Sequence, residues 1–488
     1  MEKGLATHAS RESLVLPPQE ASESDPSTSP WKYKLIALIC ALLMSAGSHF
    51  STNALNALKT TLKSEMHINN TQYGVMSSSV SLINTILPFL GGVWMDRFGT
   101  GWGALLSTGL IVVGNAFSAM ASHLDSYAWM VVSRIIFGLG SGCVVVAQET
   151  ILSKWFRGKG LAITIGLQIT VSRLFNFLAH GTAVPIKENT GFYGNSFWVA
   201  CGISAASWIF TVIYLVLLKY TGGWEMGKKS HFSLEKVTRI PLAFWILPLN
   251  IFIFGGVWTP FLGIATEFVQ QRFGTSEIIS AWTSSVSLAI PVAVSPFAGL
   301  FYERYGKRGP VVILSAVFLI IAMGLLGWSD ASPMAGLVLF SLSLTLAPVA
   351  LTSSVALILP PGLIGTGIGI HKGCLNAGVS LVDVLVGAIQ DHQGGSYARV
   401  STALMVLSCI SLLLTCLFWF VDVRFLNGIL DAPFSIRKHL QEHRQEAYLA
   451  GALIPMTPMA RRLSWTAIGL VVMVLILSWV VYGVYLFK

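Results

Sequence analysis

The stretch GGVWMDRFG at residues 91–99 returns in altered form as GLFYERYG at 299–306. Both copies carry glycine, an acidic residue, arginine, an aromatic residue and glycine at the same spacing. These positions are Gly92, Asp96, Arg97 and Gly99 in the first copy, and Gly299, Glu303, Arg304 and Gly306 in the second. Each copy ends an apolar segment of helical length and opens a short turn. The duplication predicts two membrane-embedded halves with the same orientation.

The composition is that of an integral membrane protein. Of the 488 residues, 54% are hydrophobic and only 11% are charged, and the mean hydropathy is +0.69. Soluble domains carry about 25% charged residues. The six cysteines form no C-x-x-C pair, so we expect small buried side chains and neither disulfides nor a metal site.

Thirteen segments are long and apolar enough to be spans, since a transmembrane helix needs about 20 such residues. They lie near 33–56, 72–94, 102–121, 127–152, 159–182, 195–219, 241–266, 278–301, 309–328, 333–359, 363–389, 398–421 and 464–487. We therefore predict an all-α membrane protein with two six-helix bundles and a thirteenth C-terminal transmembrane helix. The predicted parts are a disordered tail (1–30), a first bundle (31–219), a linker (220–240), a second bundle (241–421), a cytosolic segment (422–462) and the extra helix (463–488).

The placement of lysine and arginine predicts the orientation. Most of the 31 fall in the N-terminal tail and in loops on the same side of the membrane as that tail. Cytosolic loops are enriched in these residues, so both the tail and the 220–240 linker should be cytosolic. The net charge of +9 is thus a topology signal, and no nucleic-acid partner is expected. Asn69 begins the sequence Asn-Asn-Thr in the first far-side loop and is a glycosylation candidate.

Two arginines lie within predicted spans, where a charge costs at least about 2.5 kcal/mol and must face a cavity or a partner. Arg134 precedes a glycine-rich run in span four. In span five, Arg173 shares one helical face with Asn176 and His180. A guanidinium at that depth offers two parallel hydrogen bonds to a carboxylate, although an ion pair within the protein is the alternative.

Further polar residues on spans one and eleven extend the predicted substrate site. Span one contributes His49, Thr52 and Asn56, and span eleven contributes Lys372, Asn376 and Asp383. Lys372 and Asp383 are too far apart along the helix to pair, so each should find a partner on another span. Glu149 in span four is expected to pair with Lys154 or Arg157. Asp96 and Glu303 of the repeated motif are expected to cap neighbouring helices and to act as conformational gates with their arginines.

The chain contains no phosphate-binding loop, no H-E-x-x-H and no usable Ser/His/Asp set. Enzyme activity and cofactors are therefore not expected.

The block FGLGSGCVVVAQETILSKWFRGKGLAITIGLQITVSRL at 137–174 resembles the lysosomal dipeptide transporter branch of the major facilitator superfamily. Shared features are Phe137-Gly138, the Val-Ala-Gln triplet at 146–148, Trp-Phe-Arg-Gly-Lys at 155–159, Gly-Leu-Gln at 166–168 and Arg173. The run LIGTGIGI with the following NAG and GAIQD is also similar. The resemblance implies two six-helix bundles, with Arg173 at the carboxylate of the substrate.

The chain departs from that branch at the place of a glutamate that the family sets near the amine of the substrate. Here the position is Gly142 or Cys143. The family also has twelve spans and not thirteen.

From these features we expect a symporter or uniporter that moves a small organic solute by alternating access. The resemblance favours a dipeptide or an amino-acid-like carboxylate, in a lysosomal or vacuolar membrane, with the plasma membrane as the alternative. The other hypotheses are a proton-coupled monocarboxylate or sugar porter and a solute sensor or scaffold that does not transport. The expected partners are a small-molecule substrate and the lipid bilayer. A proton as coupling ion and an accessory membrane subunit are further candidates.

Overall fold

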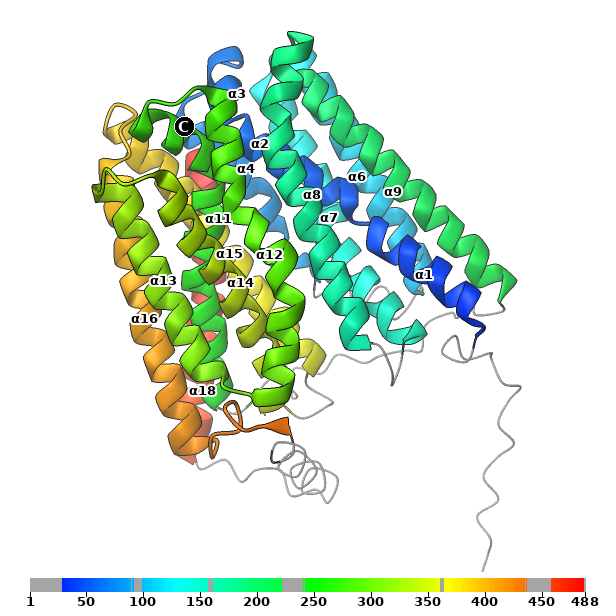
Figure 1. The fold of residues 1–488 in the computed structure, drawn as a ribbon, viewed down its shortest axis with the longest axis vertical. Helices are drawn as coiled ribbons and strands as arrows, with labels where there is room; N and C mark the ends of the chain where they lie inside the picture. The colour runs from blue at the N-terminus through cyan, green and yellow to red at the C-terminus, as the bar shows by residue number, and fades with distance from the viewer. Residues whose placement is uncertain are drawn as a thin grey trace, which may run out of the picture.

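The two halves of the chain form two bundles of α-helices that stand next to each other (Figure 1). A computed structural model describes residues 29–88, 90–91, 99–156, 161–221, 240, 242–359, 364–434, 436 and 458–486. Most of the predicted tail and linker, and residues 437–457 of the predicted cytosolic segment, lie outside the described residues.

The first bundle begins with an interrupted span, because the helix breaks at Met44 and Ser45. A short helix, α3, then turns the chain at the end of the bundle. The described helices are α1 (Trp31–Leu43), α2 (Ala46–Ala57), α3 (Lys59–Glu65), α4 (Asn70–Ile83), α6 (Thr100–His123), α7 (Tyr127–Trp155), α8 (Leu161–Thr190) and α9 (Gly194–Tyr220).

In the second bundle, two helices begin at side-chain caps. Ser276 accepts a hydrogen bond from the Ile279 N–H, and Ser332 accepts one from the Met334 N–H, so each satisfies a free donor of a first turn. The elements are η2 (Leu242–Trp245), α11 (Ile246–Phe273), α12 (Glu277–Tyr305), α13 (Arg308–Trp328), α14 (Pro333–Ile358), α15 (Ile364–His392) and α16 (Ala398–Phe425).

Eleven helices in the described ranges are long and apolar enough to cross a membrane, so the chain is a multi-pass membrane protein. The spans predicted at 72–94 and 159–182 are not among them. The predicted span 72–94 begins as α4, which has 14 residues. Residues 89 and 92–94 of this span lie outside the described residues. The second is α8, which has 30 residues but whose apolar run is interrupted by Gln168, Arg173, Asn176 and His180.

Three helix pairs form the seam between the bundles: α8 with α12, α4 with α15, and α2 with α11. These are spans five and eight, two and eleven, and one and seven. When each span is replaced by its counterpart in the other half, spans five and eight become spans eleven and two. Spans one and seven are counterparts of each other, so that pair is unchanged. The seam therefore has the two-fold pseudosymmetry that the duplicated motif predicts.

Each half has apolar cores of its own, and the seam carries many of the polar side chains. One buried cluster is built from residues 240–430, and two others come almost wholly from the first half. This division lets each bundle keep its packing while the two halves move relative to each other.

We call the end of the molecule at which α3 lies the α3 end, and the end at which α1 begins the α1 end (Figure 1). The lysine and arginine pattern predicts that the α1 end faces the cytosol.

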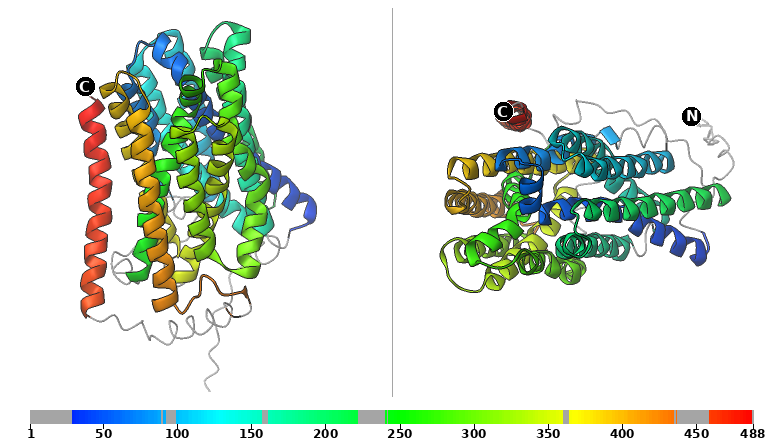
Figure 2. Two further views of the ribbon diagram at one scale, coloured as in Figure 1. Left: turned by 60° about the vertical axis from the view of Figure 1, so that its left-hand side comes forward. Right: turned by 90° about the horizontal axis from the view of Figure 1, so that it is seen from above.

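The C-terminal helix α18 (Pro458–Leu486) stands outside the two bundles (Figure 2). It packs on α4 and α15, one helix from each half. The Tyr482 hydroxyl lies 2.9 Å from Ser79 Oγ, and Trp479 Nε1 donates to Thr85 Oγ1 at 3.2 Å. We predict that α18 spans the membrane as a thirteenth helix, because it is one of the eleven apolar helices.

A candidate substrate site between the bundles

Arg173 lies on the face of α8 that points to the seam, as the helical periodicity predicts. Its side chain is half-buried, and His49 of α2 lies within electrostatic range. Within the part of the chain that the structure describes, no carboxylate forms an ion pair with this guanidinium. Arg173 is therefore the candidate with an available charge at the seam.

The other two residues of the predicted α8 face are engaged by the protein itself. The Asn176 side-chain oxygen accepts a hydrogen bond from Asn53 Nδ2 at 2.9 Å. His180 Nε2 lies 2.8 Å from Ser284 Oγ on α12 and 3.1 Å from Thr266 Oγ1 on α11. His180 thus joins the two bundles in this conformation.

The predicted residues of span one follow the seam along α2. His49 and Thr52 are half-buried, and the Thr52 hydroxyl donates to the Ser48 carbonyl of its own helix at 3.1 Å. Asn56 is buried where α2 passes close to Gly263 of α11. Of the three, His49 is the one within electrostatic range of Arg173.

Arg134 lies in the interior of the first bundle. It is 1% exposed, its Nη1 donates to Ser51 Oγ at 3.1 Å, and its guanidinium lies 4.4 Å from the centre of the Phe137 ring. Ser51 continues the network to Asn115, which donates to Ser204 at 2.7 Å. These contacts tie α7 to α2, α6 and α9, and the predicted role of Arg134 in substrate binding stays a prediction.

Lys372 and Asp383 of α15 both find partners in the other bundle, as predicted. Lys372 pairs with Glu149 of α7 at 3.1 Å, and Asp383 accepts a hydrogen bond from Ser77 of α4 at 3.2 Å. The sequence did not predict Lys372 as a partner of Glu149; the expected pairing with Lys154 or Arg157 stays a prediction, because Arg157 lies outside the described residues. Asn376 donates back to the Lys372 carbonyl at 2.9 Å.

The family position for an acidic residue in α7 packs against the residue that follows α4. A Cβ at Gly142 would collide with the side-chain oxygen of Asn84, the C-cap residue of α4. Neighbouring Cys143 is buried and packs in the apolar core of the first bundle. A larger residue at Gly142 would require the Asn84 side chain to move.

The second copy of the repeated motif forms the predicted turn, but another residue supplies the capping carboxylate. Asp431 Oδ1 accepts from the Gly309 N–H at 3.0 Å, at the start of α13. Its Oδ2 accepts from Trp419 Nε1 at 2.8 Å. Glu303, expected in this role, is exposed. Sequence reasoning missed Asp431 because it lies in the segment after α16, far from the motif along the chain.

The remaining residues of the motif lie as follows. Gly92, Asp96 and Arg97 lie outside the described residues. Gly99 and Gly306, which end the two copies, both have positive φ, +91° and +73°. Glycine adopts these φ angles without strain, but the ψ angles differ, 144° at Gly99 and −113° at Gly306, so the two turns are not the same. Gly299 is within α12, and Arg304 lies over the Tyr305 ring at 5.5 Å.

A buried ionic network that the sequence did not predict closes the α3 end of the seam. Glu267 of α11 pairs with Lys59 at 2.8 Å and with Lys63 at 2.7 Å, both on α3. Lys59 also donates to Gln390 at 2.8 Å and to the Tyr397 hydroxyl at 3.0 Å. Burial lowers the pKa of the Lys59 amine to about 8, and the Glu267 carboxylate opposes that fall, so Lys59 keeps its charge at neutral pH.

Two further carboxylates join the halves at this end. Asp391 of α15 accepts from the N–H groups of Asn70 and Thr71 at 3.0 and 2.7 Å, and so caps α4 from the other bundle. Glu277 of α12 accepts from Lys187 at 2.9 Å and from Thr61 at 2.7 Å. The α3 end is thus closed by charge-assisted contacts from three helices of the second bundle.

The glycosylation candidate Asn69 is exposed at the start of α4. Its side-chain oxygen accepts from the Gln72 N–H at 2.7 Å, while Gln72 accepts from the Asn69 N–H at 3.0 Å. This capping box leaves the residue at the surface, and its glycosylation remains a prediction.

Comparison with known proteins places the chain among transporters. The lysosomal dipeptide transporter MFSD1 of Homo sapiens is 26% identical over 394 residues, which cover 78% of this chain and 84% of that protein. MFSD1 of Danio rerio is 24% identical over 410 residues, or 80% of this chain and 87% of that protein.

The solved structure of a bacterial homologue of the human lysosomal transporter Spinster has the same fold. It aligns with a TM-score of 0.63 and 14% identity over 82% of this chain and 99% of that chain. A family model described as Major Facilitator Superfamily matches residues 41–382, which is well over half of the chain. With its two pseudosymmetric bundles, the chain therefore belongs to the Major Facilitator Superfamily, and it is a membrane transporter and not an enzyme.

Proposed function

We propose that the chain moves small solutes that carry a carboxylate, such as dipeptides or amino-acid-like molecules, by alternating access. The observation that carries the proposal is the Arg173 guanidinium, which faces the seam without a carboxylate partner among the described residues. The names of the curated relatives support dipeptides as the substrate class and the lysosomal or vacuolar membrane as the location.

The physical basis is the cost of an unpaired charge away from water. A half-buried guanidinium on the seam is partly withdrawn from water, and a planar carboxylate satisfies two of its N–H groups at once. Because α8 packs on α12 along the seam, a solute held by Arg173 would lie between the two moving halves. Rocking of one bundle against the other would then expose that solute to the two sides of the membrane in turn.

The absence of an acidic residue at Gly142 and Cys143 sharpens the expected selectivity. If the carboxylate of a dipeptide is the group that is held, amidation of the C-terminus should abolish its transport. Acetylation of the N-terminus should have a much smaller effect, because no acid stands at the family position for the amine. Flux of free, C-amidated and N-acetylated forms of one radiolabelled dipeptide into proteoliposomes separates the two contributions.

The main test compares Arg173→Ala and Arg173→Lys in purified, reconstituted protein. Losing a charge-assisted hydrogen bond costs about 1.5–3 kcal/mol, so we expect affinity to fall about 10- to 150-fold. Arg173→Lys should also weaken binding, since an ammonium lacks the planar fork. Arg272→Ala is the matched control, because Arg272 pairs at 3.0 Å with Asp330, which is 95% exposed.

Full affinity in Arg173→Ala would refute the assignment of the substrate carboxylate to this arginine. A panel of dipeptides, monocarboxylates and sugars separates the rival porters in the same assay. Binding without flux would identify a sensor instead of a carrier.

A further inference from the structure

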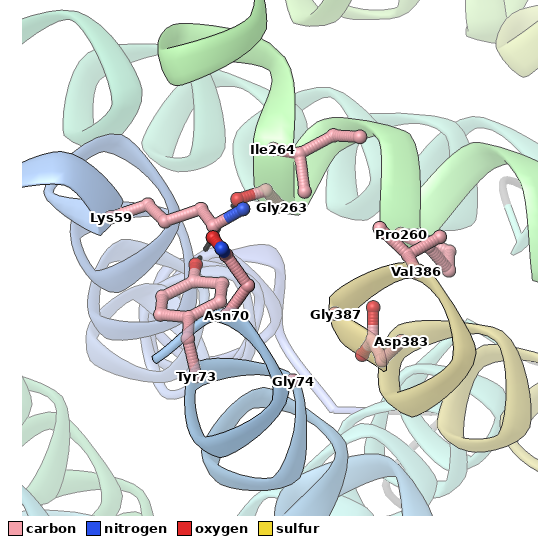
Figure 3. A pocket seen from close by; sticks show the side chains of 10 residues that line it. All are labelled: Lys59, Asn70, Tyr73, Gly74, Pro260, Gly263, Ile264, Asp383, Val386 and Gly387. Carbon is pink, nitrogen blue, oxygen red and sulfur yellow. Dashed lines mark hydrogen bonds between the residues drawn. The ribbon is translucent and has the colours of Figure 1, made fainter. Parts of the chain in front are cut away.

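A small cavity lies on the seam just inside the ionic network of the α3 end (Figure 3). Its volume of about 10 Å³ is the space of about one water molecule. Lys59 and Asp383 stand on opposite sides of it, and Tyr73 lies on the side of Lys59 (Figure 3). The wall from α11 consists of Pro260, Gly263 and Ile264, so that helix brings no charge to the cavity.

Asp383 is held in a nearly dry contact between α15 and α4. It is 7% exposed, and among the described residues its carboxylate accepts a single long hydrogen bond, from the Ser77 hydroxyl at 3.2 Å. Gly74 of α4 permits this approach, because a Cβ there would lie 2.6 Å from the Asp383 carbonyl oxygen. Within the described ranges, no lysine, arginine or histidine lies within ion-pair distance of the Asp383 carboxylate.

The neighbouring groups leave Asp383 without a compensating charge. Lys59, the cation across the cavity, already pairs with Glu267. The Tyr73 hydroxyl donates to the Gly263 carbonyl at 3.1 Å, and the Tyr482 hydroxyl of α18 bonds with Ser79. Removing a carboxylate from water with so little compensation costs several kcal/mol, and an acid in such a place takes up a proton instead.

Asp391, two turns further along the same helix, shows the opposite arrangement. Its two oxygens accept hydrogen bonds from the main-chain N–H and the side chain of both Asn70 and Thr71. Such donors stabilise the charged form of a carboxylate. Asp391 thus has hydrogen-bond donors that stabilise its ionised form. In the closed seam, Asp383 on the same helix accepts only the hydrogen bond from Ser77 among the described residues.

We propose that Asp383 is a proton-binding site whose occupancy is linked to closure of the α3 end. When this end opens, water reaches the carboxylate, which gains its charge at neutral pH. A proton from the solution on that side then binds to a carboxylate oxygen, and the neutral acid fits the dry contact with α4. Acid on the α3 side therefore favours the closed state, in which the substrate would face the α1 side.

This inference rests on alternating access in the proposed function but not on the identity of the substrate. Its test therefore measures conformation. Spin labels replace Thr190 at the end of α8 and Thr402 near the start of α16, which are both exposed and lie on different bundles at the α3 end. The exposed Cys409 and Cys416 are substituted first. Double electron–electron resonance then gives the closed fraction between pH 5 and pH 8, without any substrate.

In the parent protein, we expect the closed fraction to rise as the pH falls. Asp383→Asn, which mimics the neutral acid, should be closed across the whole range and lose the pH dependence. Asp330→Asn is the control and should follow the parent protein, since Asp330 lies at the surface away from the seam.

Ser77→Ala provides a second variant that leaves the acid in place. Ser77 donates to the carboxylate and so favours its charged form; without this donor the midpoint of closure should rise by about half to one pH unit. An Asp383→Asn protein that keeps the pH dependence of its parent, or an unmoved midpoint in Ser77→Ala, would overturn the proposal. If instead the pH dependence follows Asp383 while no carboxylate-bearing solute is transported, the proton site stands and the proposed function fails.

Discussion

The two ends of the seam are held together by different physics. At the α3 end, Glu267, Glu277 and Asp391 make charge-assisted contacts across the bundles, and Glu267 is 3% exposed at its side chain. At the α1 end, the cross-seam ion pair among the described residues is Lys372 with Glu149, whose side chains are 23% and 43% exposed. Buried pairs lose much more than exposed ones when one partner is removed. The difference teaches that buried charge-assisted contacts hold the α3 end in this conformation, while the described ion pair at the α1 end is partly exposed and contributes little.

The largest expected effect is that of Glu267→Gln, which keeps the shape but removes the charge shared by Lys59 and Lys63. Breaking a buried pair by removing one partner costs about 3–5 kcal/mol, because the remaining charge is left without compensation. We expect the α3 end to open. The measurement is the closed fraction, taken from the distance between spin labels at positions 190 and 402.

The double variant Lys59→Gln with Glu267→Gln serves as the control for this experiment. Since it leaves no unpaired Lys59 charge in the network, it should recover much of the closed fraction. A closed fraction in Glu267→Gln equal to that of the parent protein would show that the network does not hold the seam.

A smaller effect is expected for Asp391→Asn. This variant retains one acceptor oxygen for the donors of Asn70 and Thr71 but loses the charge that strengthens these bonds. The expected cost of about 1–2 kcal/mol corresponds to a 5- to 30-fold change in the ratio of closed to open molecules. The same spin-label distance measures it, and Asp330→Asn is again the control. A larger loss than in Glu267→Gln would reverse the order of the two contacts.

The smallest effect is expected at the α1 end, for Lys372→Gln. A partly exposed ion pair contributes about 0–1 kcal/mol and is screened by salt. The conformational equilibrium of this variant should therefore differ little from that of the parent protein, and the difference should vanish at high salt. If its loss approached that of Glu267→Gln, the contrast between the two ends would be wrong.

The resemblance and the repeat were enough to predict the fold class, and the helical periodicity predicted that Arg173 shares one face of its helix with Asn176 and His180. Arg134 illustrates the limit of such reasoning. Its position within a span indicates that it needs a partner, but Ser51 and Phe137 become its neighbours only after α2 and α7 pack together. Asp431 and Glu267 drew no attention in the sequence, because neither belongs to a motif.

The sequence by itself determined the features that depend on near neighbours along the chain. Apolar runs define the spans, lysine and arginine bias predicts the sides, and the duplicated glycine–acid–arginine pattern specifies two like halves. The tertiary structure alone decided which charges meet. Lys63 and Glu267 are 204 residues apart, and Lys59 and Gln390 are 331 apart. Whether a buried charge is paired, as in Glu267, or left available, as in Arg173, depends on the groups that packing brings within about 4 Å of it, and no local pattern contains that information.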